Sequence, residues 1–237
     1  MTHELEAPAD WASLYQARGD DVNPSRPVLT GDVFRNVPTI DSAGEKKRDV
    51  LLLQHPCSLR RDGVNLVPKL LVAKVQNFRP LESEEWSGFA RQMPLPDLRS
   101  HEQNQRKRHF AALFDDLFIV SPEQIVQGER YASMSPAGIN TLLQRWVYNS
   151  TRAVIPTSTF HECNAAVFEE VDLIEEWCDD RNGLVTELEA ASECVTWLRE
   201  PVGDDGPTRQ ETLRDPQQRS PIRRQMRAHL KNLSRPS

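Results

Sequence analysis

The sequence has no apolar run near the ~20 residues that a membrane-spanning helix requires, and its mean hydropathy is −0.59. Its first residues, MTHELEAPADW, are acidic and contain no apolar core, so we expect neither a secretory leader nor membrane association. Cysteine is also scarce, at four residues, which without a leader favours reduced thiols over a disulfide framework. These absences predict a cytoplasmic protein.

Basic residues are scarce between positions 110 and 200, where the net charge is −11, whereas residues 30–109 and 201–237 each carry +4. Like charges held together repel each other unless a complementary surface meets them. Either different faces of the molecule bind different partners, or the charge is simply solvated. Composition leaves both interpretations open.

The spacing of apolar residues predicts a mixed α+β fold with a β-rich core. β-branched and aromatic residues indicate strands at 28–37, 50–54, 66–75, 116–120 and 130–134. An amino-terminal arm, 1–27, should hold a short helix over 10–18, and the charged stretch 77–112 should be an insertion. Ser135 and Pro136 indicate a helix start, and Ile139, Leu142 and Leu143 fall on one face of a helix reaching 152.

Two more helices are predicted in residues 153–200. Thr159 and Glu162 form a capping box, apolar residues recur at helical spacing on both sides of Asn182-Gly183, and the two stretches form an αα-hairpin. Residues 201–237 are rich in proline, glutamine and arginine, so we expect a flexible, disordered basic tail. Within it, only 220–233 has the pattern of an amphipathic helix.

The segment HPC, residues 55–57, follows a predicted strand and admits more than one chemistry. Zinc would require His161 and Cys163 as further ligands, but these two point apart at a helix start, so we predict no metal site. Cys57 would serve as a nucleophile if His55 or the following arginines activated it. A small buried residue that closes a strand accounts for Cys57 equally well.

Basic clusters lie in three predicted loops: Lys46 and Lys47; Arg60 and Arg61; and Arg106, Lys107 and Arg108. Positive loops gathered over a curled sheet would suit a nucleic-acid backbone, although aromatic residues for base stacking are few nearby. A solvated face explains the clusters about as well.

The segments TGDVF (30–34), RDVLLLQHP (48–56), LLVAKVQ (70–76) and DLFIVSPEQIVQ (116–127) occur in an order that resembles the PemK/MazF toxin endoribonucleases. The likeness covers residues 30–148, interrupted by the insertion 77–112. It implies a small antiparallel β-barrel of the PemK/MazF type, closed by the helix over 136–152. The αα-hairpin and the basic tail would be additions to that domain.

The same resemblance implies metal-independent cleavage of single-stranded RNA, without a cofactor. Arg48 matches the family's catalytic arginine, and Gln76 stands where the family has threonine or serine. Glutamine cannot transfer protons, so His55 is the substitute acid or base. The predicted catalytic residues are therefore Arg48, His55 and Gln76, and the three basic clusters would bind the RNA backbone. Asp49 departs from the family's proline.

Two functions remain open from sequence. The first is an RNA-binding or RNA-cleaving protein in a toxin–antitoxin or phage-defence setting, with single-stranded RNA and a second copy of the chain as partners. The second is a non-catalytic adaptor that docks onto another protein through the acidic hairpin, 159–199, or the basic tail. The basic loops favour the first function, and Gln76 favours the second.

Overall fold

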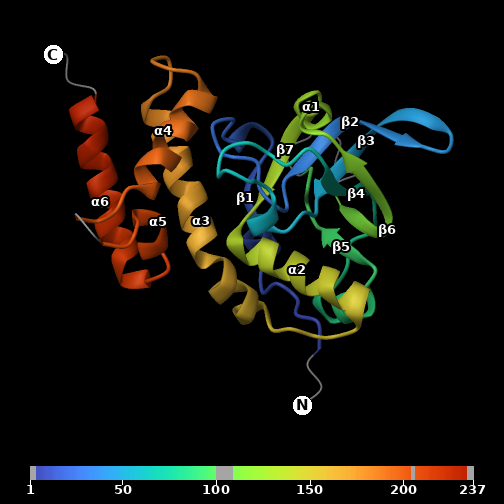
Figure 1. Cartoon of the computed structure of the whole chain (residues 1–237). Helices are drawn as coiled ribbons and strands as arrows, with labels where there is room; N and C mark the ends of the chain where they lie inside the picture. Colours follow the sequence, from blue (N-terminus) through green and yellow to red (C-terminus); the bar gives the residue numbers. More distant parts are fainter. Residues whose placement is uncertain (1–3, 100–108, 204–205, 234–237) are drawn as a thin grey trace. The chain divides into compact units, whose positions relative to one another are not determined.

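The computed structural model describes residues 4–99, 109–203 and 206–233 (Figure 1). The chain divides into two compact units. The sheet unit comprises residues 1–23, 28–59 and 66–163, and the helical unit comprises 24–27, 60–65 and 164–237. Residues 24–27 and 60–65 thus belong to the helical unit, although the residues on either side of them in sequence belong to the sheet unit.

The sheet unit is built on seven antiparallel strands. They are β1 (Tyr15–Arg18), β2 (Val33–Asp41), β3 (Gly44–Leu52), β4 (Leu70–Asn77), β5 (Gln92–Leu95), β6 (Phe110–Val120) and β7 (Glu129–Met134). Their order is β1-β7-β2-β3-β4-β6-β5. The mixed α+β fold is thus confirmed. No pairing among the described residues joins the edge strands β1 and β5, so closure into a barrel is not confirmed.

The hairpin of β2 and β3 extends beyond the other strands (Figure 1). Where β2 starts and β3 ends, Val33, Phe34, Val50 and Leu51 are buried, so this part of the hairpin belongs to the core. The far end is mostly polar, and it turns at Asp41–Gly44, where Gly44 takes a positive φ of 101° that favours glycine. The hairpin therefore carries charged side chains outwards from an apolar base.

Helices α1 (Pro122–Val126) and α2 (Pro136–Thr151) complete the sheet unit, together with the 3-10 turns η1 (Trp11–Leu14), η2 (Gly19–Asp21), η3 (Pro56–Ser58) and η4 (Ser83–Gly88). The prediction of α2 is confirmed: the Ser135 side chain caps it, and Ile139, Leu142 and Leu143 are buried. A Cβ atom at Gly138 would lie 2.1 Å from the carbonyl oxygen of Leu14, so glycine permits this close approach of η1 to α2.

One prediction about the sheet unit is wrong. The expected helix over 10–18 is only η1, after which Tyr15–Arg18 pair with β7 as an edge strand. A second strand was not predicted: within the stretch 77–112, residues 92–95 form the edge strand β5 against β6. Both strands have a single hydrogen-bonded neighbour and only four residues, which leaves little periodicity for a sequence pattern to show.

The helical unit contains most of α3 (Thr157–Asp180), together with α4 (Glu187–Arg199), α5 (Arg209–Thr212) and α6 (Pro216–Leu233). The predicted helical hairpin is confirmed as α3 and α4, and its apolar stripes form one core with residues of α6. None of the described helices is long and apolar enough to cross a membrane.

The prediction of a flexible tail is wrong for residues 209–233. Helix α6 buries Ile222, Met226 and Leu230 at four-residue spacing in the core that contains Trp177 and Trp197. The overall composition indicated disorder because apolar residues are few, but these three lie on one helical face and therefore bury together.

Within the helical unit, basic and acidic residues from segments far apart in sequence form ion pairs. Arg223 of α6 binds Glu169 of α3 at 2.8 Å, and Arg227 of α6 pairs with Glu176 of α3. Arg26 pairs with Asp172, also on α3, at 2.9 Å. The acidic hairpin and the basic tail are therefore partners of one another, which leaves less of the hairpin's charge for another protein.

Candidate nucleic-acid interface

Strands β3 and β4 bring two of the predicted catalytic residues to one face of the sheet. The pairs Leu52–Val72 and Val50–Lys74 fix the register of these antiparallel strands. Continuing that register by two residues places Gln76 opposite Arg48, and the period of two along a strand puts both on the face of Val50 and Lys74. Gln76 is exposed.

The guanidinium of Arg48 already has internal partners. It ion-pairs with Asp41, donates a hydrogen bond to the Thr39 hydroxyl, and lies 4.8 Å from the centre of the Phe118 ring. Its side chain is 13% exposed. The backbone N–H of Ala43, followed by the charges of Arg48 and Lys46, holds the pKa of Asp41 below its ordinary value. Asp41 is therefore a weak base at neutral pH, and an RNA phosphate would have to displace it from Arg48.

Lys74 provides a second cation on this face. Its ammonium binds Asp116 at 2.9 Å, across an irregularity in the β4–β6 pairing that lies between Ala73 and Lys74. Both side chains are about one-third exposed, at 32% and 37%. Solvent-accessible ion pairs contribute only about 0–1 kcal/mol, so a competing anion can exchange with the carboxylate.

The predicted lysines lie on the projecting part of the β2–β3 hairpin, and both are exposed. Lys46 is opposite Thr39 and therefore shares the face of Arg48, whereas Lys47 is opposite Pro38 and projects from the other face. We name the exposed and partly exposed set on the Arg48 face the cationic strip. It consists of Lys46, Arg48, Lys74, Gln76 and Phe118.

His55 does not join the cationic strip. From Arg48 to the end of β3 at Leu52 the chain rises ~13 Å, and His55 lies three residues further on. Its Nδ1 accepts a hydrogen bond from the backbone N–H of Cys57 at 3.3 Å, and partial desolvation lowers the pKa of the imidazole. His55 thus caps η3, and its place beyond the end of β3 does not support proton transfer beside Arg48.

The other two basic clusters lie outside the described part of the sheet unit. Arg60 and Arg61 belong to the helical unit, where the Nε of Arg60 donates to the carbonyl oxygen of Val64 at 3.1 Å. The third cluster, Arg106, Lys107 and Arg108, lies outside the described residues. Of the clustered basic residues that the structure describes in the sheet unit, Lys46 shares a face with Arg48 and Lys47 does not.

Cys57 and Cys163 are exposed free thiols. The contact of His55 with Cys57 involves the backbone amide, so it gives the thiol no base. Among the described residues, no group of three or more histidine, cysteine or carboxylate side chains is placed to hold a metal ion.

Sequence reasoning missed Lys74, Phe118 and the carboxylates Asp41 and Asp116. One signal was available for Lys74, because a charged residue two positions before Gln76 in an apolar strand shares its face. The carboxylates gave no such signal, since their positions depend on the hairpin register and on the irregularity between β4 and β6.

Comparison of the chain with protein-family models gives no match, and none of the curated proteins matches it. The resemblance to the PemK/MazF toxins therefore rests on the quoted segments and on the geometry of Arg48 and Gln76.

Proposed function

We propose that the sheet unit binds the sugar–phosphate backbone of single-stranded RNA along the cationic strip, without cutting it. The observation that carries the proposal is the register of β3 and β4, which puts Arg48, Lys74 and Gln76 on one face. Exposed Lys46 extends the positive charge along the hairpin.

The chemistry of these side chains suits a phosphodiester backbone. A guanidinium donates to phosphate oxygens in a fork geometry, an ammonium acts as a point charge, and an amide donates a neutral hydrogen bond. The Phe118 ring, partly exposed beneath Arg48, offers a surface for stacking. Each contact is to backbone or to a base face, so the strip should bind with little sequence preference.

Binding is better supported than cleavage. Cutting requires a group with a pKa near the working pH within reach of the scissile phosphate. Gln76 cannot transfer a proton, His55 lies beyond the end of β3, and the pKa of Asp41 is lowered. Arg48 and Gln76 can therefore hold a phosphate, whereas the described side chains of the strip supply no matched acid and base.

The proposal is tested by the fluorescence anisotropy of a labelled single-stranded RNA of mixed sequence. We expect Lys74→Ala to weaken binding about five- to tenfold, equivalent to ~1–1.4 kcal/mol. It should also reduce the slope of log affinity against log salt by about 0.7, because one phosphate contact is lost. The matched control is Lys69→Ala, an exposed lysine just before the opposite end of β4.

Lys69→Ala should change the affinity less than twofold. An equal loss in both variants, or no binding by the wild type at low salt, would overturn the proposal. The same RNA incubated with the protein and EDTA should stay intact on a denaturing gel. Metal-independent cutting that disappears in Arg48→Lys would instead establish a nuclease.

A further inference from the structure

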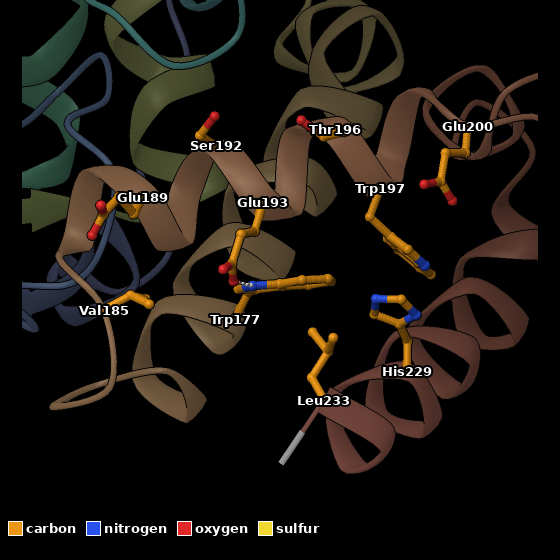
Figure 2. A pocket seen from close by; sticks show the side chains of 10 residues that line it. All are labelled: Trp177, Val185, Glu189, Ser192, Glu193, Thr196, Trp197, Glu200, His229 and Leu233. Atoms are coloured by element: carbon orange, nitrogen blue, oxygen red, sulfur yellow. Dashed lines mark hydrogen bonds between the residues drawn. The ribbon is translucent and has the colours of Figure 1, made fainter. Parts of the chain in front are cut away.

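The helical unit contains a cavity of about 530 Å³ whose floor is aromatic. Trp177 of α3, Trp197 of α4 and His229 of α6 form a triangle with ring centroids 5.8, 5.6 and 6.1 Å apart. In Figure 2, His229 and Leu233 point from α6 towards the two indoles. The indoles are buried, but Leu233 is 45% exposed, so an apolar wall remains open to solvent.

Carboxylates from α4 form the rim of this cavity. Glu189 and Glu193 line it from one face of α4, four residues apart, and Glu200, the C-cap residue of α4, lines it as well. Arg181 binds Glu193 at 3.0 Å and Arg209 binds Glu200 at 2.9 Å, so these two charges are balanced. Within the part of the chain that the structure describes, Glu189 has no such ion pair.

The carboxylate of Glu189 is held by the start of α4. It accepts a hydrogen bond from the backbone N–H of Thr186 at 2.9 Å and another from the Thr186 hydroxyl at 2.8 Å. These bonds lower its pKa, so the side chain is ionised at neutral pH. The rim therefore presents one fixed negative charge.

The indole of Trp197 already binds a cation of the chain itself. The guanidinium carbon of Arg209 lies 4.6 Å from its ring centre. Indole faces attract lysine and arginine because of their ring quadrupole, and the aliphatic stems of these residues pack on apolar surface. An apolar floor with a negative rim thus complements a side chain that is apolar along its stem and positive at its tip.

We propose that this cavity docks a basic segment of a protein partner, with one lysine or arginine head at Glu189 and its apolar flank on Leu233. The cavity volume lies within the usual range of ligand pockets, ~300–1,000 Å³. RNA is a poor occupant because its phosphates would face the carboxylates of the rim. The inference is independent of RNA binding by the cationic strip, and it gives the helical unit a function of its own.

The experiment follows the indole N–H signals of the full chain by NMR while peptides are added. Three end-blocked peptides of about nine residues have the same leucines and glycines. At two further positions the first peptide has lysine, the second glutamine and the third glutamate. We expect the lysine peptide to shift the Trp177 and Trp197 signals saturably. The glutamine and glutamate peptides should bind at least fivefold more weakly.

Glu189→Gln isolates the charge, because glutamine can still close the capping box with Thr186. It should reduce affinity for the lysine peptide about fivefold. Glu187→Gln is the matched control, since Glu187 is exposed in the same helical turn but does not line the cavity. Leu233→Ala should reduce the affinity for all three peptides by the same factor.

The inference would be overturned if the lysine and glutamine peptides bound with equal affinity, or if Glu189→Gln and Glu187→Gln reduced the affinity for the lysine peptide equally. It would also be overturned if the Trp177 and Trp197 signals did not shift at millimolar lysine peptide. Shifts of these two signals by RNA would also contradict it, because the cavity would then accept an anion.

Discussion

The ammonium of Lys74 lies 2.9 Å from the carboxylate of Asp116, which reaches it from β6. Arg48 and Asp41 repeat this relationship on β3 and β2. Arg48 and Lys74 of the proposed RNA surface are thus each held by an internal carboxylate that competes with phosphate. Removing the competitor should strengthen binding, a gain that loss of stability cannot imitate.

We therefore predict that Asp116→Asn raises RNA affinity about three- to tenfold, ~0.7–1.4 kcal/mol, since it frees Lys74 and removes a repulsive charge. Anisotropy titration at fixed salt measures the change. Asp115→Asn is the control, because the neighbouring Asp115 alters net charge equally but contacts Arg91, at 3.8 Å. Identical gains in both variants would show that only net charge matters.

A second prediction concerns Arg145, which is fully buried in α2. It donates to the carbonyl oxygens of Trp86 at 3.0 Å and Phe89 at 3.1 Å, and burial lowers its pKa to about 10. Arg145→Leu removes both hydrogen bonds and leaves the Trp86 carbonyl with the backbone N–H of Phe89, at 3.3 Å, so we expect unfolding free energy to fall by roughly 2–4 kcal/mol in urea titration. Arg91→Ala, at a 73% exposed side chain, should cost less than about 0.5 kcal/mol. If Arg145→Leu and Arg91→Ala lowered the free energy of unfolding equally, the hydrogen bonds of Arg145 would not stabilise the fold as proposed.

The third prediction tests the packing of α6. Met226 is fully buried in the helical core, so Met226→Ala should lower the unfolding free energy by roughly 2–4 kcal/mol. Leu233→Ala in the last turn of α6 should cost under about 1 kcal/mol, because that side chain is 45% exposed. Urea or thermal unfolding followed by tryptophan fluorescence compares the two. If Met226→Ala left the free energy of unfolding unchanged, α6 would not pack on this core.

The fourth prediction uses the thiols as probes of the same core. Cys57 and Cys163 are exposed, whereas Cys178 and Cys194 are buried, and burial raises the pKa of Cys178 to about 12. A thiol-reactive dye at pH 8 should therefore label two cysteines rapidly and the other two only after unfolding. Mass spectrometry of the labelled peptides identifies them. Rapid labelling at Cys178 or Cys194 would contradict the packed helical unit.

Much of the architecture could be predicted from sequence where the burial of one face gives the apolar residues a regular spacing. Central strands β3 and β4 and helix α2 bury continuous apolar faces, and their patterns are plain. The edge strands β1 and β5 were not predictable, because each is short and Pro94 interrupts β5, as an edge position allows. Helix α6 was obscured by its arginines, whose partners lie ~50 residues away on α3.

The candidate site could be predicted only in part. Alternation along β3 and β4 gives the faces of Arg48 and Gln76, but the pairing register decides that they are opposite each other. His55 was assigned to the site because its imidazole can transfer protons where Gln76 cannot. Its position depends on where β3 ends, and the structure places it after Leu52 as the cap of η3.

The most direct test of RNA binding along the cationic strip is NMR mapping of isotope-labelled protein titrated with single-stranded RNA. We predict that the signals of Arg48, Lys74 and Gln76 shift first and saturate together, while those of His55 stay unchanged. Shifts confined to Arg60, Arg61 or the helical unit, or no shifts at millimolar RNA, would contradict it.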